Sequence, residues 1–330
     1  MTDRNSKSGR MARVLAWVTV CATVPLLLIG GTVTTLRVGM AVPDWPTTFG
    51  ENMFTYPLSE MLANMAVFWE HSHRLWASGV GMLVILTAVA TWAGGHTGRA
   101  KALSLVALAA VIGQGILGGF RVLENSQQLA FLHGSIAQLV FAIFVMLAIV
   151  LSQSWNAVEP RPCKRTPKLR RWSLLAVGSV YAQIVLGAWL RHSGSMLALA
   201  LHGVLVLAVI FAVMKLMAAL RESYEDGVAG EHDRSIFMRL RKRLALLLWG
   251  QVGLGIVTAV AVMVFSGGFD ERPSQLEQIV ATGHVALGAL LFVTTVAAAL
   301  WAHKLVTLGQ RERVPVRAHD AQHDDAMVTA

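Results

Sequence analysis

The sequence contains eight apolar runs, each about as long as a helix that crosses a lipid bilayer. They are residues 14–36, 66–93, 102–120, 129–152, 172–190, 196–219, 244–266 and 279–303. A helix needs about 20 mostly apolar residues to span the hydrocarbon core. Backbone groups cannot stay unpaired in lipid, so runs of this kind are expected to be helical. The sequence therefore predicts an all-α, polytopic membrane protein with eight transmembrane helices.

The charged residues predict how the helices are oriented. The chain is 55% hydrophobic and only 14% charged, which is too apolar for a soluble domain. Its net charge of +9 could indicate a nucleic-acid partner. Most of the basic residues, however, lie in alternate polar segments such as 153–171 and 220–243. Because Lys and Arg collect in cytoplasmic loops, this pattern predicts that both termini are cytoplasmic and excludes nucleic acid.

An unusual cluster of charged residues stands where the second apolar run begins, at Glu70-His71-Ser72-His73-Arg74. A charged side chain at the bilayer centre costs at least about 2.5–3.5 kcal/mol, so such groups are usually paired and functional. On a helix, Glu70, His73 and Arg74 share one face. We expect this face to point into the bundle and to handle a ligand. His71 points about 100° away from Glu70 and is expected to be an interface residue.

An internal repeat is the most specific feature of the chain. Three predicted helices carry a glutamine and, four residues later, a glycine, and the next predicted helix carries a histidine. The three sets are Gln114, Gly118 and His133; Gln183, Gly187 and His202; and Gln251, Gly255 and His284. The first run has Ile29-Gly30-Gly31 in the matching place, and the run after it contributes His73. In each of four helix pairs, the second helix therefore carries one of these histidines.

The four histidines are predicted to lie at one depth, one to two turns below the outer surface. At pseudo-symmetric positions they can form two facing pairs, and neutral imidazole is a common ligand of haem iron. The pattern therefore predicts two haem sites, one in each four-helix half. Arg121 and Arg191 are candidates to pair with haem propionates, or are simply interfacial. The glutamines are expected to hydrogen-bond between helices rather than to contact haem, and the glycines allow close approach of a macrocycle or helix.

With these motifs the sequence resembles the haem A synthase family from about residue 28 to residue 303. The segments that carry the resemblance are Gly30-Gly31-Thr32, Pro43-Asp44-Trp45-Pro46, Glu70 to Arg74, Gln114 to Gly118 with His133, Gln183 to Gly187 with His202, and His284. The resemblance implies two pseudo-symmetric four-helix bundles. Residues 1–155 would form the N-terminal half and 156–309 the C-terminal half, and we expect 310–330 to be a disordered cytoplasmic tail.

The resemblance also implies a reaction, the oxidation of a ring methyl of haem O to a formyl group. The product, haem A, would serve terminal oxidases in the bacterial cytoplasmic membrane. His73 and His133 would hold the substrate haem, and His202 and His284 a permanent haem b. Glu70 matches a glutamate that is associated with activity. Arg74, together with Arg121 and Arg191, completes the set of expected haem-binding residues.

The sequence departs from the family pattern at two places. Many bacterial members have a cysteine pair flanking the Asp-Trp-Pro segment, and here those positions look like Val42 and Thr48. An outer-loop disulfide is therefore excluded, and we expect no loop staple and no thiol-mediated step. The Gly-Arg that often follows the histidine-arginine pair is replaced by Ala77-Ser78, which leaves substrate positioning open.

Two other functions explain the four histidines. A di-haem b-type electron carrier needs them equally but has no necessary role for Glu70, which could form a purely structural pair with Arg74. A haem-handling assembly factor would bind one haem loosely and release it unchanged. The expected partners are haem O and membrane lipid. The haem O-forming farnesyltransferase, the electron donor and a homo-oligomer stay open as further partners.

Overall fold

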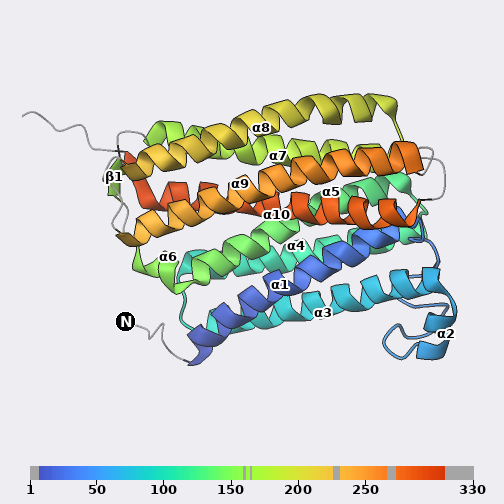
Figure 1. Ribbon diagram of the computed structural model, residues 1–330. Helices are drawn as coiled ribbons and strands as arrows, with labels where there is room; N and C mark the ends of the chain where they lie inside the picture. The colour runs from blue at the N-terminus through green and yellow to red at the C-terminus, as the bar shows by residue number, and fades with distance from the viewer. Residues whose placement is uncertain (1–6, 159–160, 164–165, 226–230, 266–272, 309–330) are drawn as a thin grey trace, which may run out of the picture.

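Eight long helices form the body of the described part of the chain (Figure 1). The computed structural model describes residues 7–158, 161–163, 166–225, 231–265 and 273–308. The long helices are α1 (Lys7–Thr35), α3 (Met65–Ala93), α4 (Gly98–Leu123), α5 (Gln127–Leu151), α7 (Thr166–Ser193), α8 (Met196–Glu225), α9 (Glu231–Val260) and α10 (Gln275–Leu305). All eight are long and apolar enough to cross a membrane, so the prediction of a polytopic all-α protein is confirmed.

Short elements complete the described chain. They are α2 (Leu58–Ala63), α6 (Gln153–Ala157), the π-helical turn η1 (Ala261–Phe265), and the strands β1 (Arg161–Cys163) and β2 (Val306–Leu308). The two strands pair in parallel. The tail predicted at 310–330 lies outside the described residues.

Polar caps set where several helices begin and therefore which turn carries each histidine. The side chain of Asn64 accepts the N–H of Ala66 at the start of α3, and that of Ser126 accepts the N–H of Leu129 at the start of α5. A cap of this kind stabilises a helix by about 1 kcal/mol. With α5 beginning at Gln127, His133 falls in its second turn.

The helices pack in pairs, and the pairs form two similar groups. Helix α1 packs against α3 and α4 against α5, while α7 packs against α8 and α9 against α10. The two groups meet through α1, α5, α7 and α10, and α5 and α10 are the most buried long helices among the described residues. The division of the chain at residue 155 stays a prediction, because these helices form a continuous interface between the groups.

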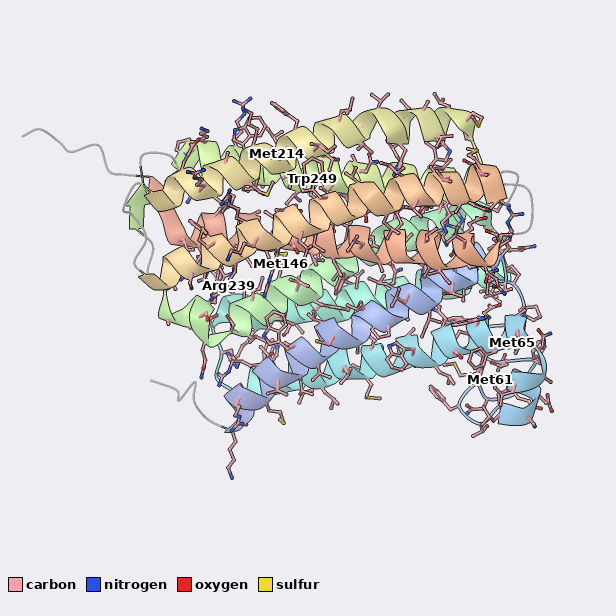
Figure 2. The ribbon with its side chains drawn as sticks, in the orientation of Figure 1. Met61, Met65, Met146, Met214, Arg239 and Trp249 are labelled. Carbon is pink, nitrogen blue, oxygen red and sulfur yellow. The ribbon has the colours of Figure 1, made fainter. Side chains whose placement is uncertain are left out.

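The outer faces of the bundle are strongly apolar. On α8, Val204 and Leu207 are 69% and 70% exposed, and on α9 Leu246 is 75% exposed. Side chains of this kind suit a lipid environment, where water is absent. Figure 2 shows Arg239 near the end of the bundle opposite to Met61 and Met65. We call the end that carries Met61 and Met65 the α2 end; its predicted location outside the cell stays a prediction.

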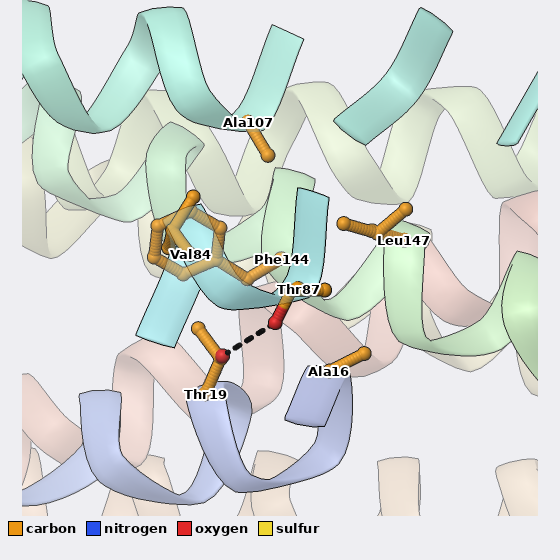
Figure 3. A pocket seen from close by; sticks show the side chains of 7 residues that line it. All are labelled: Ala16, Thr19, Val84, Thr87, Ala107, Phe144 and Leu147. Atoms are coloured by element: carbon orange, nitrogen blue, oxygen red, sulfur yellow. Dashed lines mark hydrogen bonds between the residues drawn. The ribbon is translucent and has the colours of Figure 1, made fainter. Parts of the chain in front are cut away.

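A small pocket lies among α1, α3, α4 and α5 (Figure 3). Its lining residues are Ala16, Thr19, Val84, Thr87, Ala107, Phe144 and Leu147. The hydroxyl oxygens of Thr19 and Thr87 lie 3.3 Å apart and share a hydrogen bond. Thr87 follows His73 by about 20 Å along α3 at the helical rise per residue. The pocket therefore belongs to the packing of the N-terminal helices and not to the histidines.

Candidate functional site

The structure brings the four repeat histidines together as two pairs. His73 from α3 faces His133 from α5, with ring centroids 6.5 Å apart and ring planes at 80°. His202 from α8 faces His284 from α10, with centroids 6.4 Å apart and planes at 67°. The two pairs thus have nearly the same geometry, and they join the residues that the repeat predicts to face one another. Iron ligation by these residues stays a prediction.

Each of these imidazoles packs against a glycine of the preceding long helix. The contacts are Gly30 with His73, Gly118 with His133, Gly187 with His202, and Gly255 with His284. A Cβ at any of these glycines would lie only 2.9 or 3.0 Å from the imidazole Cε1. That is well inside the carbon–carbon optimum of about 3.5–4.0 Å. The glycines expected from the repeat therefore have a specific partner, the histidine ring of the neighbouring helix.

The repeat glutamines reach the same histidines. Gln114 Nε2 donates to the main-chain oxygen of His133 at 2.8 Å and lies 3.1 Å from His133 Nδ1. Gln183 Nε2 donates to the main-chain oxygen of His202 at 2.9 Å. In the third set, Gln251 Nε2 lies 3.2 Å from His284 Nε2. As expected from the sequence, these residues link neighbouring helices by hydrogen bonds.

The histidine pairs fit haem better than a metal site made by the protein alone. A metal bonded to imidazole nitrogens at about 2 Å on both sides places the ring centroids about 6 Å apart, close to the observed spacing. The Nδ1 atoms of His73, His202 and His284 are buried without a hydrogen-bond partner in the described part of the chain. No group of three or more His, Cys, Asp or Glu side chains gathers among the described residues. Haem needs only axial ligands, because its macrocycle supplies the other four.

Glu70 and Arg74 form a buried ion pair that holds the loop before α2. Arg74 Nη2 lies 2.7 Å from Glu70 Oε1, and the two side chains are 9% and 5% exposed. Glu70 Oε2 accepts the main-chain N–H of Val42 at 3.0 Å. Arg74 donates to the main-chain oxygens of Val42, Asp44 and Thr47 at 2.6–3.1 Å. The i,i+4 pair that the sequence allows is thus present, with the loop as an additional partner that the sequence did not reveal, and the role of Glu70 in activity stays a prediction.

A second contact ties the same loop to α3. The hydroxyl of Thr48 lies 3.1 Å from His71 Nδ1, and both residues are buried, at 0% and 1% exposed. The ring of Tyr56 lies 5.3 Å from that of His71. His71, expected at an interface, thus lies between α3 and the loop. Hydrogen bonds hold both Val42 and Thr48, the two positions where many family members have cysteine.

Asp44 organises the tip of this loop. Its carboxylate accepts hydrogen bonds from the Thr47 hydroxyl and from the main-chain N–H groups of Phe49 and Gly50. Burial by itself would raise the pKa of Asp44, but these hydrogen bonds together hold the pKa below its ordinary value of 3.8. The ionised carboxylate therefore stabilises the folded loop.

The loop also extends to α4, beside the first histidine pair. Arg121 Nη2 donates to the main-chain oxygen of Gly39 at 2.7 Å. A Cβ at Gly119 would collide with the indole of Trp45. Gly119 adjoins Gly118, which contacts His133. We call residues 39–48 the loop strap, because they run from Arg121 on α4 to His71 on α3.

The second predicted arginine connects the two groups of helices. Arg191 Nη2 on α7 donates to the main-chain oxygen of Gly31 on α1 at 2.7 Å, and also contacts the hydroxyl of Thr35. Thr35 in turn lies 3.3 Å from the hydroxyl of Thr282 on α10. Pairing of Arg121 and Arg191 with haem propionates stays a prediction.

Comparison with known proteins gives a consistent result. A family model described as cytochrome oxidase assembly protein, COX15-CtaA, matches residues 13–203, more than half of the chain. A curated protein named heme A synthase from Alkalihalophilus pseudofirmus is 31% identical over 195 residues, covering 57% of this chain and 62% of the relative. Another of that name from Halalkalibacterium halodurans is 28% identical over 194 residues, with coverages of 57% and 62%.

A third protein named heme A synthase, from Lysinibacillus sphaericus, is 30% identical over 193 residues, covering 56% of this chain and 60% of the relative. The chain thus spans about three-fifths of the length of the curated relatives it matches. The matched family region includes His73, His133 and His202, and it ends before His284. With its eight apolar helices and bacterial relatives, the chain is a multi-pass bacterial membrane protein.

Proposed function

Because this chain belongs to the COX15-CtaA family of cytochrome oxidase assembly proteins, we propose that it is an enzyme of haem A biosynthesis. Its reaction would be the oxidation of a ring methyl of haem O to a formyl group. The observation that carries the proposal is the occurrence of two facing histidine pairs with centroid spacings of 6.5 and 6.4 Å. Relatives named heme A synthase support the same assignment.

In this proposal the two pairs have different roles. His73 and His133 hold the substrate, haem O, and His202 and His284 hold a resident haem b. Haem iron supplies the oxidising chemistry, while the protein supplies position and electrostatics. The assignment of His284 rests on the repeat and on its contact geometry with His202, because His284 lies beyond the matched family region.

The loop strap has a role in substrate positioning under this proposal. It contacts α3 through Glu70 and Arg74, and α4 through Arg121 and the Trp45–Gly119 contact. His73 lies on α3, and Gly118 on α4 contacts His133. A strap held at both sides would exclude water from the substrate ring and fix its edge for oxidation.

The proposal is tested by supplying haem O to membranes that contain the protein and separating the extracted pigments. We expect a formylated haem from the native protein and none from His73→Ala. A His202→Ala variant should lose the resident haem while keeping the ability to bind haem O. Native protein that is loaded with haem and forms no formylated pigment would overturn the proposed reaction.

One observation favours a second candidate, a di-haem electron carrier that does not alter its own porphyrin. Both carboxylate oxygens of Glu70 are engaged in holding Arg74 and Val42, so the structure accounts for Glu70 without a chemical role. Glu70→Gln discriminates the two functions if haem content is measured beside haem A formation. Retained haem with lost haem A formation supports the enzyme, whereas unchanged electron transfer with no haem A at any stage supports the carrier.

A further inference from the structure

The four helix pairs differ at one position, one helical turn before the glycine that contacts the histidine. Four residues before the contact glycine, three pairs have glutamine and the first pair has leucine. The residues are Gln114, Gln183, Gln251 and Leu26. All four glycines nevertheless make the same contact with their histidine. The histidine rings are therefore placed alike, and what differs is the side chain beside them.

The glutamine can hydrogen-bond its histidine at two places, the main-chain oxygen and a ring nitrogen. In the Gln183 pair the carboxamide N–H already binds the main-chain oxygen of His202. Both Gln183 Oε1 and His202 Nδ1 are buried without a hydrogen-bond partner in the described residues. A neutral imidazole that gives Nε2 to a metal keeps its proton on Nδ1 and needs an acceptor there. Gln183 Oε1 is the candidate for that acceptor, because it belongs to the residue that already holds the His202 main chain.

The Gln114 pair has the same parts in closer contact. Its carboxamide nitrogen binds the main-chain oxygen of His133 and lies 3.1 Å from His133 Nδ1, and its Oε1 is buried without a partner among the described residues. A rotation of the carboxamide that brings Oε1 to Nδ1 would give His133 the same acceptor. The third glutamine touches a different ring atom: Gln251 Nε2 lies 3.2 Å from His284 Nε2, and Gln251 Oε1 and His284 Nδ1 are both buried without a partner among the described residues.

The first helix pair lacks this acceptor. Leu26 is apolar and packs against the hydrophobic core. His73 Nδ1 is buried without a hydrogen-bond partner in the described part of the chain. Outer partners of metal-bound histidines typically contribute a factor of about 10–100 in metal affinity. Among the described residues, the first pair is thus the one in which no glutamine of the neighbouring helix reaches the histidine.

We propose that Gln114, Gln183 and Gln251 are positioning residues for haem-ligating histidines. We also propose that Leu26, which cannot hold its histidine in this way, makes His73 the ligand that detaches from the haem. This inference rests on the proposed function. The pair with two glutamines, His202 and His284, holds its haem permanently. The pair with one glutamine keeps His133 as a fixed ligand and lets His73 detach, so that a substrate haem can arrive and its product can leave.

The test follows release of haem from the full-length protein. Protein loaded with protohaem in detergent is mixed with excess apomyoglobin, and absorbance records the transfer. We expect a fast phase from the His73 site and a slow phase from the His202 site. Leu26→Gln should slow the fast phase about tenfold, and Gln183→Met should speed the slow phase about 10–100-fold. Gln183→Met should also change the low-spin electron paramagnetic resonance signal of that site.

Gln138→Met is the matched control, because Gln138 is a buried glutamine on α5 that is no part of the repeat. It should change neither phase. The inference is overturned if Leu26→Gln leaves the fast phase unchanged in protein that still holds two haems, or if Gln138→Met acts like Gln183→Met. Should Leu26→Gln fold poorly, Gln183→Met and its resonance signal decide alone. Native protein that takes up no haem would overturn the proposed function itself. Native protein that binds two haems but shows no effect of these substitutions would overturn only the role of the glutamines and Leu26.

Discussion

The contact between Gly118 and His133 allows a quantitative prediction for Gly118→Ala. The added Cβ would lie 2.9 Å from the imidazole Cε1, against an optimum of about 3.5–4.0 Å, so ring or helix must move by about 0.6–1.1 Å. Overpacking of this kind costs about 1–3 kcal/mol, while the higher helix propensity of alanine returns about 1 kcal/mol. We expect a net loss of up to about 2 kcal/mol in the free energy of unfolding, which arises because the His133 ring is displaced.

Gly115→Ala is the matched control on the same helix. A Cβ at Gly115 meets nothing within 4 Å, so this variant should keep or slightly raise stability through helix propensity alone. The assay compares thermal unfolding and haem content of the two variants in detergent. A loss of about 1.4 kcal/mol in ring position corresponds to tenfold weaker haem binding for Gly118→Ala. Equal haem affinity in the two variants would refute the idea that the glycine exists to seat the imidazole.

Three further predictions concern the loop strap. Arg74→Ala should cost about 3–5 kcal/mol, because Glu70 stays buried without its cation, and limited proteolysis should then cut the loop; resistance to cleavage would contradict this. Thr48→Val removes the hydrogen bond to His71 and should lower the free energy of unfolding by about 1 kcal/mol, with a loss near zero as the opposing result. Because the pKa of Asp44 is lowered on folding, its contribution to stability is complete above pH 3.8 and disappears as the pH falls through the lowered folded value. The protection of the loop amides, measured as their exchange rate relative to the intrinsic rate at each pH, should therefore fall on acidification. Asp44→Asn should remove this acid dependence, and an unchanged pH profile would refute the role of the carboxylate.

Much of the architecture follows from local patterns in the chain. The length and apolarity of each run determine a membrane helix, because unpaired backbone groups are too costly in lipid. The recurring glutamine, glycine and histidine then predict the histidine partners, since equivalent helices that return from the same side carry their side chains at equal heights. The pairs His73–His133 and His202–His284 could therefore be proposed before any coordinates were known.

Other features depend on contacts that no local pattern encodes. The partners of Arg74 are main-chain oxygens of Val42, Asp44 and Thr47, and backbone groups carry no sequence signal. The same holds for the bond between Arg191 and the main chain of α1.

What the sequence by itself determined is which segments enter the membrane and which residues recur at equivalent positions. Hydrophobicity and helical period are properties of a single segment, so they can be read along the chain. What only the tertiary structure decided is that each repeat glycine meets a histidine ring and that hydrogen bonds tie the loop strap to α3. These contacts depend on how far each helix is rotated and shifted against its neighbours, and the packing of all the helices together sets that arrangement.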